Sequence, residues 1–411
     1  MDDGQSTLIG RLLDDAKAIL ADQLAHVEEV SRRRGGSGPA LALLTDGLRA
    51  EREQGITIDV AYRYFATPRR RFIIADTPGH AQYTRNMVTG ASTADLALIL
   101  VDAENGVTQQ SRRHAAIARL LGLRHVTVAI NKMDLVDYSE AAFDAVVREL
   151  CDWAARLDLH DLTFIPLSAL HGDNVVERSS RLGWYDGPPL LEHLETVPVG
   201  TDEAERPARL PIQHVIRADG RRYAGQVAAG VLRRGDEVIV LPAGTRTRVV
   251  AIEGPDGERE AAPAGLSVAV RLADELDVGR GDLLAGADGA PVGRRELDAT
   301  VCWLGDAPAH PGSRYLLKHT TRTVRARIES IEHRLDVETL AHVPAPQLAL
   351  NDIARVRVRT GDAVLADPYD ESRATGAFIL VDEATNETVG AGMVAAESAG
   401  QPPRDSAERR P

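Results

Sequence analysis

In the first half of the chain, short apolar runs alternate with helical patterns. This feature of the sequence constrains the fold more than any other. Apolar residues recur at helical spacing from Leu8 through Leu24, and further helical stretches span Gln109–Leu121 and Ala141–Trp153. The apolar runs, each followed by polar or turn residues, are Phe72–Ala75, Leu96–Val101, Val126–Ile130 and Phe164–Leu167. This rhythm predicts an α/β domain with a mostly parallel, doubly wound sheet, in which ligands bind at the carboxyl ends of the strands.

The second half of the chain has a different pattern. It begins after a Pro-rich, charged segment from Val197 to Pro211 that is typical of a linker. Short β-type runs separated by glycine then follow in two sets, which predict two small barrels or sandwiches. We expect domains at residues 1–200, 208–292 and 293–395, and a disordered tail at 396–411, where the sequence is small, polar and Pro-containing.

Composition narrows the functional classes. A formal net charge of −13 over 411 residues argues against a nucleic-acid partner, because phosphate binding usually leaves a basic footprint. The sequence has no run of 18 apolar residues and no basic-then-apolar leader, so we expect a cytoplasmic protein without a membrane partner. Cys151 and Cys302 form no CxxC pair, which suggests neither a disulfide framework nor a thiolate metal site.

The first candidate motif, Asp76-Thr77-Pro78-Gly79-His80, directly follows the apolar run that ends at Ala75. An Asp at a strand end can hold Mg²⁺ through water, and the Gly79 N–H can reach a terminal phosphate. The imidazole of His80 can orient an attacking water. Taken alone, an Asp-x-x-Gly pattern is explained equally well by a turn.

Two further motifs follow at the ends of later strands. Asn131-Lys132-Met133-Asp134 can read a guanine base: the Asp134 carboxylate accepts from the N1–H and the exocyclic amine, which adenine does not offer. Asn131 would brace the loop, and the Lys132 stem would lie across the base. In Ser168-Ala169-Leu170, backbone N–H groups can contact the guanine carbonyl. The order of the three motifs at successive strand ends predicts a guanine-nucleotide site.

These residues resemble the large GTPase subunit of sulfate adenylyltransferase, a family of the elongation factor Tu-like GTPases. The resemblance rests on the three motifs and on four further stretches, and it covers nearly the whole chain up to about residue 395. The four stretches are residues 54–65, 223–227, 274–283 and 317–324.

The resemblance implies a P-loop GTP-binding domain followed by two β-barrels. It also implies GTP hydrolysis coupled to the formation of adenosine 5′-phosphosulfate and pyrophosphate from ATP and sulfate. In that family the adenylyl transfer belongs to a smaller subunit, so we expect the small adenylyltransferase subunit as partner, in a heterodimer or higher heteromer.

The family opens with a strand and then a phosphate loop, Gly-x-x-x-x-Gly-Lys-Ser. This sequence starts inside that loop, at Met1-Asp2-Asp3-Gly4-Gln5-Ser6-Thr7, so Gly4 matches the second loop glycine. The first glycine and the leading strand have no counterpart, and flanking strands would then expose unpaired backbone groups. We still expect residues 2–7 to contact the nucleotide, with Ser6, Thr57 and Asp76 around Mg²⁺. Thr57 would be the hydroxyl that senses the γ-phosphate, the alternative being an edge-strand threonine.

Gln5 stands where the family has its phosphate-binding lysine. A hydrogen bond to a charged group contributes about 1.5–3 kcal/mol, so the loss of the lysine weakens GTP binding by roughly 10- to 150-fold. Either the chain start is placed too far downstream, which restores the strand but leaves Gln5, or the subunit hydrolyses GTP weakly or not at all and is a scaffold. A translation factor that delivers tRNA shares the fold and motifs, but the stretches in the second half disfavour it.

Overall fold

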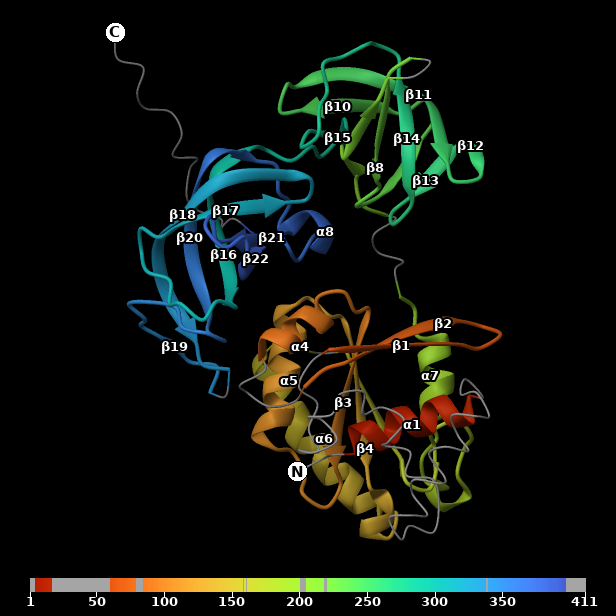
Figure 1. The fold of residues 1–411 in the computed structure, drawn as a ribbon. Coiled ribbons are helices and arrows are strands. Elements are labelled where there is room, and N and C mark those ends of the chain that lie inside the picture. The colour runs from red at the N-terminus through yellow and green to blue at the C-terminus, as the bar shows by residue number, and fades with distance from the viewer. Residues whose placement is uncertain are drawn as a thin grey trace. The chain divides into compact units, whose positions relative to one another are not determined.

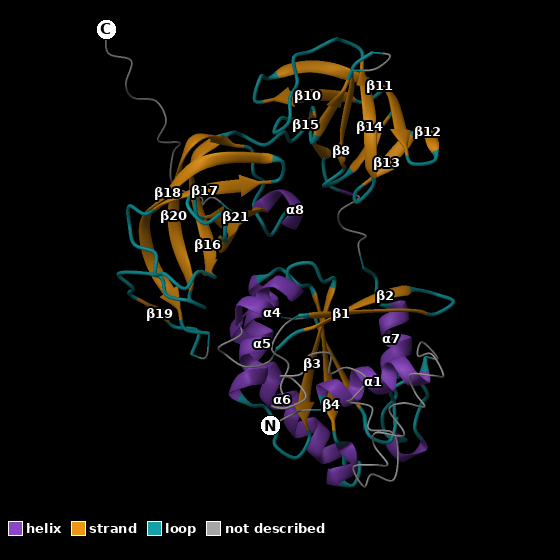
Figure 2. Ribbon diagram, in the orientation of Figure 1, coloured by secondary structure: helices purple, strands orange, loops and turns teal. Residues whose placement is uncertain are grey.

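A computed structural model of the chain describes residues 4–16, 60–78, 84–157, 159, 161–199, 205–217, 220–337 and 339–396. The chain divides into two compact units, residues 1–199 with 337–339, and residues 200–336 with 340–411. Nearly all the helices belong to the first unit, whereas strands dominate the second (Figure 2). No helix in the described ranges is long and apolar enough to cross a membrane.

The first unit is built on a parallel sheet of strand order β3–β4–β5. Its strands are β3 (Leu96–Asp102), β4 (His125–Asn131) and β5 (Leu162–Pro166). The crossover connections are α5 (Gln109–Leu120) and α6 (Glu140–Ala154). Each helix has an N-cap whose side chain accepts a hydrogen bond from a backbone N–H of the first turn, Thr108 for α5 and Ser139 for α6. β4 lies in the centre and is buried from its second residue onward, as expected for a strand covered on both faces.

Helices cover both sides of this sheet. α1 (Gln5–Asp15) and α7 (Leu190–Thr196) share one apolar core with the sheet, in which Leu8, Leu190 and Ile165 are fully buried. Figure 1 shows α5 and α6 on the opposite side. The helix predicted from Leu8 to Leu24 is described only as far as its cap at Ala16, and residues 17–24 lie outside the described ranges. Short helices are η3 (Met133–Val136), η4 (Ala155–Leu157) and η5 (Ser180–Leu182).

A hairpin of β1 (Ala61–Ala66) and β2 (Arg71–Asp76) precedes this sheet and is followed by α4 (Thr84–Ala91). The rings of Phe65 and Phe72 stack 4.6 Å apart across the hairpin and join the core under α1. Among the described strands, no ladder joins β2 to β3, so the described residues of this unit form two separate sheets.

The second unit begins with an eight-stranded antiparallel sheet in the order β6–β15–β10–β11–β14–β8–β7, from which β12 branches at β11, and a separate two-stranded sheet of β9 and β13. Its strands are β6 (Arg209–Pro211), β7 (His214–Ile216), β8 (Arg222–Gln226), β9 (Val231–Arg233), β10 (Glu237–Leu241), β11 (Thr245–Gly254), β12 (Gly257–Arg259), β13 (Ala261–Pro263), β14 (Ser267–Leu272) and β15 (Leu283–Gly286). The two ends of this sheet approach each other at Gly225 of β8, where a Cβ would lie 2.2 Å from the Pro211 carbonyl oxygen.

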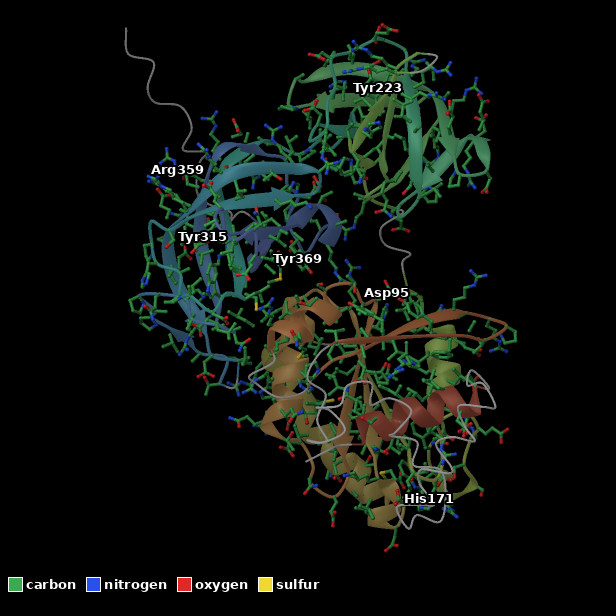
Figure 3. The ribbon with its side chains drawn as sticks, in the orientation of Figure 1. Asp95, His171, Tyr223, Tyr315, Arg359 and Tyr369 are labelled. Atoms are coloured by element: carbon green, nitrogen blue, oxygen red, sulfur yellow. The ribbon has the colours of Figure 1, made fainter. Side chains whose placement is uncertain are left out.

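The remaining strands close a six-stranded barrel, β17–β21–β22–β16–β20–β18, in which β18 pairs back to β17. They are β16 (Arg294–Trp303), β17 (Arg314–His319), β18 (Arg322–Leu335), β20 (Ile353–Val364), β21 (Ala377–Val381) and β22 (Thr388–Val394), with β19 (His342–Val343) and α8 (Arg373–Gly376) outside the ring. Tyr223 of the first β region and Tyr315 of the barrel are both buried (Figure 3). The predicted order, an α/β domain followed by β-barrel structure, is confirmed.

The two β regions of the second unit are joined by a buried ion pair. Arg209 of β6 donates from Nε and Nη2 to the two carboxylate oxygens of Asp367, at 3.1 and 3.0 Å. Asp367 also accepts from the Thr375 hydroxyl at 2.6 Å. Leu283 and Ala285 of β15 pack with Leu365 beside this pair.

Candidate guanine-nucleotide site

Asn131 connects two of the predicted site segments. Its Oδ1 accepts from the Ala169 N–H at 2.9 Å, which holds the Ser168–Leu170 loop against the end of β4. On the other side, the side-chain amide of Asn131 lies against Gly4, the N-cap of α1. A Cβ on Gly4 would meet Asn131 Nδ2 at 2.4 Å, and Gly4 has a φ of +89°, so both space and backbone conformation require glycine there.

A second contact, made by Asp134, joins the Asn131–Asp134 motif to the Ser168–Leu170 loop. The Ser168 hydroxyl donates to Asp134 Oδ1 at 2.6 Å, and the Met133 N–H donates to the Leu167 carbonyl at 3.3 Å. His171, labelled on the surface of the first unit in Figure 3, approaches Asp134 Oδ2 with its Nε2 at 3.8 Å. The structure therefore brings the second and third motifs together, with the half-buried Asp134 carboxylate at their junction.

Lys132 makes a contact that the sequence did not predict. It has a left-handed backbone, with a φ of 62°, and its ammonium donates to Asp102 Oδ2 at 2.8 Å. Burial raises the pKa of the Asp102 carboxyl, but hydrogen bonds from Lys132, the Glu104 N–H and Asn105 outweigh it and leave that pKa below its usual value. Asp102 directly follows the second predicted strand, as Asp76 follows the first, and that position was the signal available in the sequence.

The other end of the site is formed by α1 and the end of β2. The Gln5 side-chain amide donates to Asp76 Oδ1 and, at 3.1 Å, to the Thr77 carbonyl. Asp76 is buried, as is Pro78, while Gln5, Ser6 and Thr7 are half-buried in the first turn of α1. That turn contains no acidic residue, and no side chain caps it, so its N–H groups favour an anion.

The described residues thus place Gly4, Asn131 and Ala169 in one group, Asp134 beside Ser168, and Gln5 beside Asp76 and Thr77. Leu170 is 63% exposed at the tip of its loop. Five of the predicted site residues, Asp2, Asp3, Thr57, Gly79 and His80, lie outside the described ranges. Within those ranges, no cluster of three His, Cys, Asp or Glu side chains could hold a metal ion. The arrangement offers the Asp134 carboxylate at one end and the N-terminus of α1 at the other.

Comparison with known proteins agrees with this geometry. Residues 1–199 match the family of elongation factor Tu GTP binding domains, and residues 296–395 match the GTP-eEF1A C-terminal domain-like family. The fold and the site together define a GTPase of the elongation factor Tu type.

Relatives define the family more narrowly. The chain is 55% identical to the bifunctional enzyme CysN/CysC of Mycobacterium tuberculosis, over 100% of this chain and 68% of that protein. It is 49% identical to sulfate adenylyltransferase subunit 1 of Laribacter hongkongensis, over 100% of this chain and 87% of the relative. The corresponding subunit of Cellvibrio japonicus is 52% identical over 96% and 84%. The chain belongs to the sulfate adenylyltransferase subunit 1 family.

Proposed function

We propose that the chain is the regulatory GTPase subunit of a sulfate adenylyltransferase. It binds GTP with Mg²⁺, and its hydrolysis of GTP drives a smaller adenylyltransferase subunit to form adenosine 5′-phosphosulfate and pyrophosphate from ATP and sulfate. The observation that carries the proposal is the junction of Asp134 with Ser168 and of Asn131 with Gly4 and Ala169. That junction supports a guanine site in a chain whose relatives are named as this subunit.

Guanine selection follows from the chemistry of Asp134. An ionised carboxylate only accepts, and the guanine edge offers two adjacent donors, N1–H and the exocyclic amine. Ser168 already donates to Oδ1, which fixes the orientation of the carboxylate. Adenine presents an unprotonated N1 and a C2–H at this edge, so it loses both hydrogen bonds and places an acceptor against a negative charge. Asn131 keeps the loop and the phosphate-binding turn in register.

The phosphate end is proposed to use Gly4, Gln5, Ser6 and Thr7 of α1, whose N–H groups and helix dipole favour the phosphates. The Ser6 hydroxyl and the Asp76 carboxylate are oxygen ligands of the kind Mg²⁺ prefers, so the donor set fits that ion. Mg²⁺, when bound, neutralises charge on the phosphate oxygens. Thr57 would complete the donor set, and His80 would orient the attacking water.

A hydrolysis-impaired scaffold is the second candidate, and one observation favours it. Gln5 has no charge to offer the phosphates, and its amide is engaged by Asp76 and the Thr77 carbonyl. The Gln5 amide must leave Asp76 before this carboxylate can face a hydrated cation. The cost of breaking that contact lowers the affinity for the nucleotide–metal complex. The two candidates share guanine binding and differ only in turnover.

Binding and turnover should be measured on the full chain, alone and with the small subunit. A fluorescent GDP analogue is titrated with Mg²⁺, and displacement by unlabelled GDP is compared with displacement by ADP. We expect GDP to displace the probe and ADP to leave it bound. GTP hydrolysis that rises in the presence of the small subunit, ATP and sulfate supports the regulatory GTPase, whereas binding without turnover supports the scaffold. Displacement by ADP and GDP alike would overturn both.

A further inference from the structure

Arg11 of α1 is a second side chain, besides Asn131, that holds the Ser168–Leu170 loop. Its Nε donates to the Ala169 carbonyl at 3.3 Å, and its Nη2 donates to the Leu170 carbonyl at 2.7 Å. Asp15, one turn further along α1, pairs with Arg11 Nη1 at 3.5 Å and orients the guanidinium. Burial raises the pKa of Asp15, and Arg11 acts in the opposite direction. The Arg11 side chain therefore donates hydrogen bonds to two consecutive peptide groups of the loop.

The first of these peptide groups also carries the Leu170 N–H. Because the peptide unit is planar and trans, its C=O and N–H point in opposite directions, so fixing the Ala169 oxygen fixes the direction of the Leu170 N–H. The neighbouring donors of the loop are already used. Ala169 N–H donates to Asn131, and His171 N–H donates to the Ser168 hydroxyl at 3.3 Å. Within the described part of the chain, the Leu170 N–H has no acceptor.

The guanine edge needs such a donor at this place. It presents the O6 acceptor, the N1–H donor and the amine donor in a row, and the proposed role of Asp134 uses only the two donors. The donor for O6 must then lie beside Asp134. The Ser168 contact to Asp134, at 2.6 Å, brings the Ser168–Leu170 loop to that position.

We propose that Arg11 is a positioning residue for guanine selection, which aims the Leu170 N–H at the O6 carbonyl of the base. This inference rests on the proposed guanine site. It adds a mechanical link from α1, whose N-terminus faces the phosphates, to the loop that reads the base. The alternative is a purely structural role, in which Arg11 only stabilises the packing of the loop on α1.

The test compares GDP with 6-thio-GDP, which keeps N1–H and the amine but replaces O6 with sulfur, a much weaker acceptor. Both nucleotides are titrated with Mg²⁺ against the full chain and its variants. We expect Arg11→Ala to lower GDP affinity about 10-fold, the equivalent of one well-formed hydrogen bond, and to leave 6-thio-GDP affinity nearly unchanged. The preference for GDP over 6-thio-GDP should therefore fall about 10-fold.

Two further variants keep the test interpretable. Arg11→Lys retains one donor that reaches a single carbonyl, so its preference should lie between those of the wild-type chain and Arg11→Ala. Arg178 is the matched control, because its guanidinium also donates to backbone carbonyls and these lie outside the three motifs. They are the carbonyls of Tyr185, Asp186 and Gly187. Arg178→Ala should leave the preference unchanged.

The outcomes separate this inference from the proposed function. An Arg11→Ala variant that binds both nucleotides less well by the same factor, or that keeps the wild-type preference, overturns the positioning role and leaves the guanine site standing. A wild-type chain that fails to bind GDP overturns the proposed function, and this inference with it. If Arg11→Ala does not fold, the preference of Arg11→Lys decides: a wild-type value overturns the proposal, and a reduced value supports it.

Discussion

The side-chain amide of Gln5 donates to the carboxylate of Asp76 and to the Thr77 carbonyl, which ties the first turn of α1 to the end of β2. The two residues are the ones on which phosphate and metal binding are proposed to depend. An amide satisfies the buried carboxylate without a charge, so the contact stabilises the site without the nucleotide. The same contact opposes binding of the nucleotide with its metal, because the Asp76 oxygen must exchange its partner.

Gln5→Lys is expected to tighten GDP and GTP binding. A lysine supplies both a hydrogen bond and a point charge to the phosphates, and the gain corresponds to roughly 10- to 150-fold in the dissociation constant. The measurement is a titration of a fluorescent GDP analogue in the presence of Mg²⁺. Gln5→Met, which fills similar volume and removes the contact to Asp76 without adding a donor or a charge, is the control and should show a smaller gain than Gln5→Lys. Equal affinities of the wild-type chain and Gln5→Lys would show that residue 5 does not face the phosphates.

Asp134→Asn is expected to change the base that the site accepts. An asparagine side chain offers one acceptor and one donor, and so matches xanthine, which carries a carbonyl where guanine has its amine. Loss of one charge-assisted hydrogen bond of about 1.5–3 kcal/mol predicts a drop in GDP affinity of at least about 10-fold. Competition by GDP and XDP against a labelled nucleotide measures the change. Ser168→Ala, which removes the 2.6 Å contact to Asp134, should weaken GDP binding without creating a preference for XDP.

The sequence predicted the sheet of the first unit closely. β3 covers Leu96–Asp102 where a strand was predicted at Leu96–Val101, and β4 covers His125–Asn131 where the prediction was Val126–Ile130. Continuous apolar runs in a sheet covered on both faces leave little ambiguity about strand position. The domain limits at residues 200, 208, 292 and 395 stay predictions, because linker composition does not specify where packing ends.

The site was predictable only in part. Asp134 and Asn131 stand next to the ends of apolar runs, so their neighbourhood follows from the sheet. Asp102 also directly follows an apolar run, but its partner Lys132 lies 30 residues away. Arg11 carried no comparable signal, since its partners are two backbone carbonyls 158 and 159 residues away. Contacts to main-chain oxygens leave no trace in residue type. Lys132 was predicted to lie across the base, and its ammonium is held by Asp102.

The Asp102–Lys132 pair predicts how the first unit responds to acid. The pKa of Asp102 is lowered in the folded chain, so its contribution to the free energy of unfolding is present above its unfolded pKa of about 3.9. That contribution is lost as the pH falls from there through the folded pKa. Asp102→Asn should therefore destabilise β3 and β4 most at neutral pH, and the difference from the wild-type chain should shrink below about pH 4.

Amide hydrogen exchange in β3 and β4 over a pH series measures this difference. The control is Asp152→Asn, which removes an exposed carboxylate from α6 and should leave the exchange profile unchanged. A difference between Asp102→Asn and the wild-type chain that stays constant into acid would show that the carboxylate contributes through packing and not through its charge.

The Arg209–Asp367 pair is expected to determine the stability of the second unit. The Arg209 side chain is 4% exposed and that of Asp367 12%, so removing one partner leaves a buried charge without compensation. Arg209→Ala should lower the free energy of unfolding by about 3–5 kcal/mol, as found for broken buried pairs. Urea unfolding of the full chain, monitored by amide hydrogen exchange in β6 and β16, measures this change in the free energy of unfolding. Arg248→Ala breaks a pair with Glu237 whose side chains are 60% and 64% exposed, and should change stability by no more than about 1 kcal/mol. Equal losses in the two variants would mean that solvent reaches the Arg209–Asp367 pair, and that apolar contacts such as those of Leu283, Ala285 and Leu365 join the two β regions.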